Sequence, residues 1–190
     1  MKRSTPMKRS ALEDFLEPAR VRPRGPALPK GVVHLPLFVA PDEQLDLIVG
    51  ALELGTRPRG GFFLCNNEKT EHMKMMNLGR RTEGPGCHEG GPVPEAWRAL
   101  ALRSVAAARR LEPSFPPMDP DVCVVNVYTA LSKLSPHVDV PTRRDPGAPI
   151  VSVSVGLACD FVLQRGWGKK HKAHTVRLCG GDALVFGGGA

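Results

Sequence analysis

Long apolar runs are missing from this sequence of 190 residues. No stretch approaches the roughly 20 consecutive apolar residues that a helix needs to cross a bilayer, so no membrane association is expected. The basic N-terminus also lacks the apolar core of a secretory signal peptide. We therefore expect an intracellular protein and favour the nucleus or the cytoplasm, with an organelle left open because this pattern does not exclude a transit peptide.

Paired cysteines are missing as well. The five cysteines are scattered through the chain and form no CxxC pair, which argues against a zinc ribbon and against a disulfide framework. We expect them to be free thiols. They are Cys65, Cys87, Cys123, Cys159 and Cys179.

The remaining composition is that of an ordinary globular protein. Hydrophobic residues make up 42% of the chain and charged residues 24%, which is typical of a soluble domain. A chain of this length can bury one core of useful size, whereas two domains would each be small. We expect one globular unit and a monomer.

Positive charge is concentrated at the N-terminus. The net charge of +7 suits an acidic partner such as nucleic acid, but residues 1–30 hold eight Lys and Arg against three Asp and Glu, a net of +5. This segment is also rich in proline and cannot bury an apolar face. We interpret residues 1–30 as a basic, flexible tail and residues 31–190 as the domain. Three roles remain open for this tail: a nuclear localisation signal, a nonspecific phosphate-binding segment, or a solvated segment without a specific role.

Helical patterns come first along the chain and strand patterns later. Pro41 opens a helix that Gly55 ends, and a second helix follows Pro94 with an apolar stripe that begins at Trp97. Beyond Pro120 the pattern becomes short apolar runs separated by turns. This order predicts an α+β fold, an antiparallel sandwich or barrel with the N-terminal helices packed outside the sheet. The expected strands are 122–128, 150–157, 161–164, 175–178 and 183–186.

The pair His137 and Asp139 is the first chemical signal. In extended backbone, residues two apart point to the same face, so this imidazole and carboxylate should converge. One further histidine would complete the two-histidine, one-carboxylate arrangement that holds iron(II). Upstream, Asn126 and Tyr128 share a strand face and present an amide and a phenol that could grip a carboxylate. Tyr128 is the only tyrosine in the chain.

Four segments follow one another along the second half of the chain. They are Asn126-Val127-Tyr128, then 133–139 (KLSPHVD), then 148–157 (APIVSVSVGL), and 181–188 (GDALVFGG). In order and spacing they resemble the catalytic core of the AlkB family of oxygenases. The resemblance covers roughly residues 120–189, and a fainter one reaches back to about Gly31.

The resemblance implies a double-stranded β-helix, or jelly roll, with Fe(II), 2-oxoglutarate and O2 as cofactor and co-substrates. It makes His137 and Asp139 metal ligands and has Asn126 and Tyr128 bind 2-oxoglutarate. The implied reaction is oxidative demethylation, or dealkylation, of N-alkylated bases in DNA or RNA: the alkyl carbon is hydroxylated and formaldehyde then leaves. A base flipped into a pocket suits such chemistry.

The family pattern continues with a second metal-binding histidine and with arginines that pair with 2-oxoglutarate, whereas this chain ends at Ala190. We expect the domain to be incomplete at its C-terminus. A noncatalytic or vestigial jelly-roll nucleic-acid-binding protein is therefore one alternative. An oxygenase of the same family that acts on a protein or a small molecule is another.

Substrate contacts are expected from lysines. Lys133 stands beside the metal motif, and Lys169 and Lys170 lie in a later basic hairpin, where each could contact phosphate or stay solvated. The family often covers the base with an aromatic lid, but the corresponding segment 80–94 has no aromatic residue. Stacking contributes about 1–3 kcal/mol per base, so we expect a weaker grip on the base here.

Overall fold

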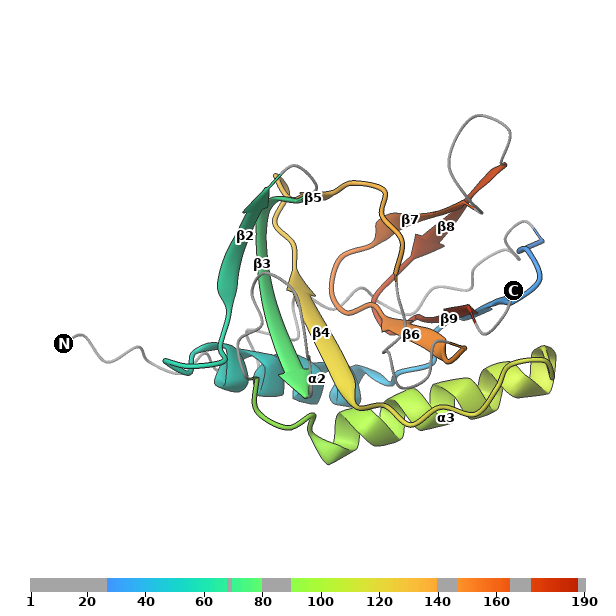
Figure 1. Ribbon diagram of the computed structural model, residues 1–190, viewed down its shortest axis with the longest axis horizontal. Helices are drawn as coiled ribbons and strands as arrows, with labels where there is room; N and C mark the ends of the chain where they lie inside the picture. The colour runs from blue at the N-terminus through green and yellow to red at the C-terminus, as the bar shows by residue number, and fades with distance from the viewer. Residues whose placement is uncertain (1–26, 68–69, 80–89, 140–146, 165–171, 188–190) are drawn as a thin grey trace.

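Two helices and nine strands form the described part of the protein in a computed structural model (Figure 1). The structure describes residues 27–67, 70–79, 90–139, 147–164 and 172–187. None of the helices in these ranges is long and apolar enough to span a membrane. The elements are β1 (Val32–Leu35), α2 (Pro41–Gly55), β2 (Phe63–Asn67), β3 (Thr70–Gly79), α3 (Glu95–Leu111), β4 (Val122–Val127), β5 (Lys133–Leu134), β6 (Pro149–Val153), β7 (Cys159–Gln164), β8 (Ala173–Leu178) and β9 (Ala183–Gly187).

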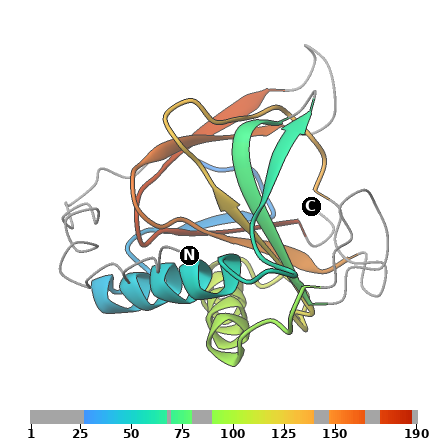
Figure 2. The same cartoon turned by 90° about the vertical axis from the view of Figure 1, so that its left-hand side faces the viewer.

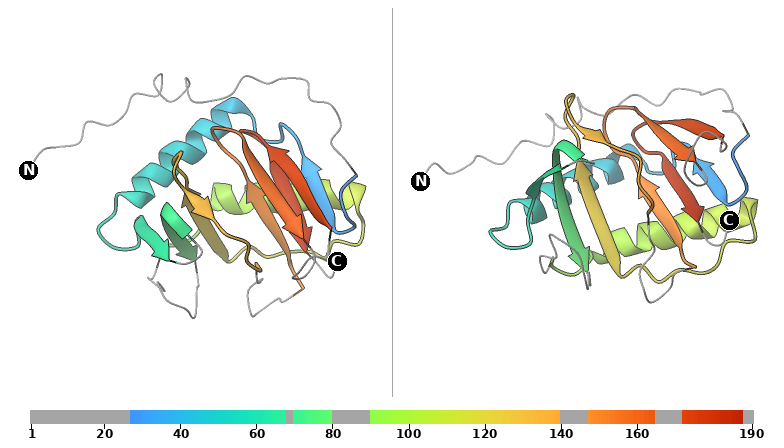
Figure 3. Two further views of the ribbon diagram at one scale, coloured as in Figure 1. Left: turned by 90° about the horizontal axis from the view of Figure 1, so that it is seen from above. Right: turned by 45° about the horizontal axis from the view of Figure 1, so that its top comes forward.

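The strands form three antiparallel groups. One sheet has the order β1-β9-β6, a second has the order β2-β3-β4 with β5 paired to the start of β3, and β7 pairs with β8. Figures 2 and 3 show the helices on one side of the strands, with the first two sheets next to each other. The arrangement confirms the antiparallel α+β architecture expected from the sequence.

Helix α2 begins and ends where the sequence predicts. Pro41 occupies the first turn, where its missing N–H leaves no hydrogen bond unmade, and acidic side chains follow it there. Gly55 ends the helix beside Phe62. A Cβ at position 55 would lie 2.0 Å from the Phe62 ring, so only glycine fits there.

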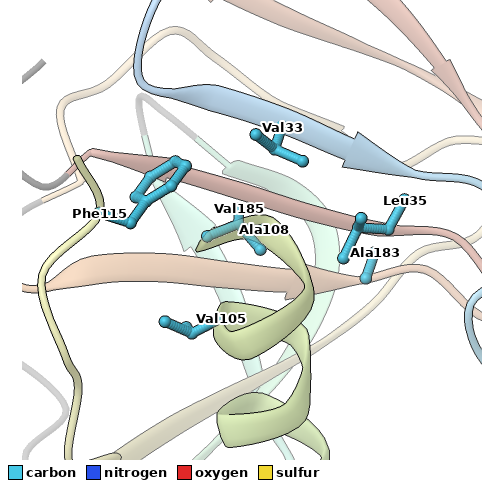
Figure 4. Packing of buried hydrophobic residues seen from close by; sticks show 7 residues of the cluster. All are labelled: Val33, Leu35, Val105, Ala108, Phe115, Ala183 and Val185. Atoms are coloured by element: carbon cyan, nitrogen blue, oxygen red, sulfur yellow. The ribbon is translucent and has the colours of Figure 1, made fainter. Parts of the chain in front are cut away.

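Helix α3 packs against the β1-β9-β6 sheet and closes the main core. Its side chains Val105 and Ala108 contact the inward residues of β1 and β9 (Figure 4). The cluster consists of Val33, Leu35, Val105, Ala108, Phe115, Ala183 and Val185. Because side chains alternate along a strand, Leu184 between two members of this cluster faces the other way.

That other face of β9 forms a second core with β7 and β8. Leu184 packs there with Val176 and Leu178 of β8, and Phe161 of β7 lies against this cluster. Leu28 also packs on the second core. The packed part of the chain therefore begins before Gly31, inside the segment that the sequence indicates as tail.

Asp182, in the turn between β8 and β9, connects these layers by hydrogen bonds. Its carboxylate is fully buried and accepts hydrogen bonds from the Leu37 N–H at 2.9 Å and the Cys179 N–H at 3.0 Å. Its Oδ2 also lies 2.9 Å from His34 Nε2 on β1. One side chain thereby links the end of β8 to β1 and to the segment that follows β1.

Strand β6 is shorter than the expected 150–157, since it ends at Val153. The next residue, Ser154, donates its N–H to the Asp182 carbonyl at 2.9 Å and accepts from the Gly181 N–H at 2.8 Å. Gly156 then takes a φ of 90°, which a strand does not allow. The apolar alternation continues past Val153, but the chain turns there.

Candidate metal and co-substrate site

The predicted co-substrate pair lies at the end of β4. Asn126 lies in β4 and Tyr128 directly after it, and alternation along extended backbone places the two side chains on the same side. Partial burial raises the pKa of Tyr128 above its ordinary value, Cys159 and Asp139 raise it too when they are ionised, and Asn126 lowers it. Tyr128 therefore lies within electrostatic reach of one predicted metal ligand and of the start of β7.

The predicted metal pair converges as the spacing indicates. His137 Nε2 lies 3.1 Å from Asp139 Oδ1, and His137 Nδ1 lies 2.9 Å from the Ser135 carbonyl oxygen. A carbonyl only accepts, so Nδ1 carries the proton of this second bond. In the neutral imidazole, Nε2 then directs a lone pair toward a carboxylate oxygen.

Two lone-pair donors that face each other need a cation between them, either a proton or a metal ion. The His137 and Asp139 side chains are 32% and 43% exposed, so an ion can reach both. A ring nitrogen held in one tautomer by a carbonyl on its far side is the usual arrangement of a metal-binding histidine. An imidazole and a carboxylate also match the ligand preferences of iron(II). The residues present fit the implied metal.

A third ligand is not brought to this pair within the described ranges. No group of three or more His, Cys, Asp or Glu side chains that could hold a metal ion occurs in that part of the chain. His34 binds Asp182 instead.

The structure covers the predicted phosphate contacts only in part. Lys133 lies in β5, with its backbone opposite Glu71 of β3. Lys169 and Lys170 lie outside the described residues. Their roles stay predictions.

Sequence reasoning missed two features beside the site. The exposed Cys159 opens β7 and raises the pKa of Tyr128, which directly follows β4 of a different sheet. The hydroxyl of Ser132 joins the β4–β5 connection to β3 across 60 positions. No local pattern signals either contact, because both depend on strands that are distant in the sequence.

The chain is similar to known proteins along most of its length. The model of the 2OG-Fe(II) oxygenase superfamily matches residues 31–190. The chain is 30% identical over 183 residues to DNA N(6)-methyladenine demethylase ALKBH1D of Arabidopsis thaliana, covering 83% of this chain and 40% of that protein. It is 35% identical over 96 residues to Alpha-ketoglutarate-dependent dioxygenase AlkB of Escherichia coli K12, covering 50% of this chain and 41% of that protein.

A solved structure described as "The structure of OsALKBH1" matches with a TM-score of 0.75 at 29% identity, covering 86% of this chain and 83% of that chain. Both the family model and the solved structure thus match most of this chain. The chain belongs to the 2OG-Fe(II) oxygenase superfamily and, within it, to the AlkB family of Fe(II)/2-oxoglutarate-dependent dioxygenases. It spans about 40% of the length of the curated relatives that it matches.

Proposed function

We propose that this protein is an Fe(II)/2-oxoglutarate-dependent dioxygenase that oxidatively removes alkyl groups from N-alkylated bases in DNA or RNA. The observation that carries the proposal is the 3.1 Å approach of His137 Nε2 to Asp139 Oδ1. Tyr128, within electrostatic reach of that carboxylate, supports it.

We assign each residue of the site a role that its geometry supports. His137 and Asp139 would hold the metal, and the Ser135 carbonyl keeps the imidazole in the tautomer that leaves Nε2 free to ligate. Asn126 and Tyr128 offer hydrogen-bond donors to the carboxylate of 2-oxoglutarate. With 2-oxoglutarate and O2, the bound metal supplies the oxidation of the alkyl carbon. A jelly roll with its N-terminal helices packed outside is the rigid scaffold of this site.

A nucleic acid is the proposed partner because relatives named as DNA N(6)-methyladenine demethylases and as AlkB match the chain. The net charge of +7 favours a polyanion. Lys133, Lys169 and Lys170 are the proposed phosphate contacts. We further propose that the protein is an intracellular monomer.

The test measures Fe(II)-dependent conversion of 2-oxoglutarate to succinate, together with loss of the methyl group from methylated oligonucleotides. His137→Ala should abolish both. His174→Ala is the matched control, because His174 lies on β8 opposite Leu163, outside the predicted ligand set. Turnover of 2-oxoglutarate without binding or demethylation of the oligonucleotide would favour a protein or small-molecule substrate instead.

The second candidate is a noncatalytic jelly-roll protein that binds nucleic acid. It is favoured by one observation, that the described residues gather two metal ligands and not three. In that case the wild-type protein binds oligonucleotides without consuming 2-oxoglutarate, and His137→Ala leaves the binding unchanged.

A further inference from the structure

Strand β3 changes partner at His72, near the tip of the second sheet. Before this point, Thr70 and Glu71 pair with β5, and after it, Lys74 to Gly79 pair with β4. His72 itself has a φ of 50°, in the left-handed region. A non-glycine residue in that region is strained and persists only where surrounding contacts hold it.

The contact that holds this kink comes from the β4–β5 connection. Ser132 Oγ donates to the His72 carbonyl oxygen at 2.7 Å. A hydroxyl has one proton and two lone pairs, so Ser132 Oγ must accept its other two bonds. These come from the Thr129 N–H at 2.8 Å and from Thr129 Oγ1 at 3.1 Å.

The same reasoning assigns the rest of the turn. The hydroxyl proton of Thr129 goes to Ser132, so its oxygen is the acceptor for the Leu131 N–H at 3.3 Å. The Ser132 N–H closes the turn on the Thr129 carbonyl at 3.0 Å. Every hydrogen-bonding position of the Ser132 hydroxyl is therefore in use.

Packing contributes little to the position of this segment. Tyr128 is 52% exposed, Leu131 74% and Val138 65%, so these side chains leave much of their surface in water. Directional hydrogen bonds are then the main restraint on the chain between β4 and the metal pair. Tyr128 directly precedes this turn, and His137 follows it after β5.

We propose that Ser132 is a positioning residue of the site. By bonding the Thr129–Ser132 turn to β3, it fixes the co-substrate residue Tyr128 relative to the metal ligands His137 and Asp139. This proposal rests on the proposed function. Ser132 belongs to neither the metal pair nor the co-substrate pair, and its side chain bonds His72 and Thr129. It acts through the turn, because the connection that it anchors joins the two halves of the site.

The test uses the single tyrosine of the chain. Isotope labelling of tyrosine at its two ε ring carbons yields one averaged ring signal in NMR, and that signal reports the surroundings of Tyr128 without metal or turnover. In Ser132→Ala the signal should shift and broaden, and in Ser132→Thr, which keeps the hydroxyl, it should return toward the wild-type position. Ser114→Ala is the matched control, since the exposed Ser114 hydroxyl donates to its near neighbour Glu112, and it should leave the signal unchanged.

Binding of 2-oxoglutarate, titrated by calorimetry in the presence of Fe(II), provides the second readout. Ser132→Ala should weaken it on the order of tenfold, and Ser132→Thr should restore it. Should Ser132→Ala fail to fold, Thr129→Val removes two bonds of the same turn and should move both readouts in the same direction.

An unchanged tyrosine signal in Ser132→Ala would overturn the inference, as would a moved signal with unchanged affinity for 2-oxoglutarate. If the wild-type protein itself binds no 2-oxoglutarate, the proposed function fails, and the tyrosine signal alone then decides whether Ser132 positions Tyr128.

Discussion

Replacing Asp182 by asparagine should destabilise the fold more than any surface substitution of the same kind. The Asp182 carboxylate has no exposed surface and lies within hydrogen-bonding distance of His34 Nε2, the Leu37 N–H and the Cys179 N–H, at 2.9–3.0 Å. Asparagine keeps the shape but turns one acceptor oxygen into an NH2 donor. That donor would face at least one of these N–H groups.

The magnitude follows from these contacts. A hydrogen bond to a charged group contributes about 1.5–3 kcal/mol, and a buried donor left without an acceptor is penalised by about 1–3 kcal/mol, a cost that overlaps with the lost bond. We expect Asp182→Asn to lower the free energy of unfolding by about 2–4 kcal/mol, and Asp182→Ala by about 3–5 kcal/mol. For a domain of this size the first value corresponds to a fall of roughly 4–16 °C in Tm.

Urea unfolding followed by circular dichroism measures this effect. Asp119→Asn is the matched control, because Asp119 is 86% exposed and pairs with Arg98 at 2.8 Å on the surface. Exposed pairs contribute about 0–1 kcal/mol, so the control should remain within that range. If Asp182→Asn unfolds at the same urea concentration as Asp119→Asn, the structural role given to Asp182 is wrong.

Two further predictions concern a thiol in β4 and a leucine of the second core. Burial raises the pKa of Cys123 from 9.0 to about 11, so the thiol keeps its proton to a higher pH in the folded protein than in the unfolded one. The free energy of unfolding should therefore fall by about 3 kcal/mol as the pH rises from below 9 toward 11. Unfolding at pH 8 and near pH 11 should show this loss to be smaller in Cys123→Ala, and parallel losses in both proteins would contradict it. Leu184→Ala, in the second core with 0% exposure, should cost about 2–5 kcal/mol in urea unfolding. The control Leu157→Ala, at a side chain 77% exposed, should change little, and equal costs would refute the placement of that core.

Local patterns predicted the features that depend on neighbouring residues. Pro41 and Gly55 bound α2 because both act within a single helical turn. The convergence of His137 and Asp139 follows from a spacing of two residues, which needs no knowledge of the rest of the fold.

Long-range contacts could not be predicted from the sequence, for a physical reason. His34 meets Asp182 across 148 positions, and Ser132 meets His72 across 60. Only the pairing of distant strands brings these groups together, and many polar residues of the same types stay solvated. The apolar alternation after Val153 predicted a strand that continues to residue 157, whereas hydrogen bonds between Ser154 and the β8–β9 turn end β6 at Val153.

Turnover of 2-oxoglutarate tests the central claim most directly. Succinate is measured with Fe(II) and a methylated oligonucleotide for the wild-type protein, His137→Ala and the control His174→Ala. The geometry of His137 and Asp139 predicts succinate and loss of the methyl group for the wild type and the control, and neither for His137→Ala. Absence of turnover in the wild type, or equal turnover in His137→Ala, would contradict the site described for this member of the AlkB family.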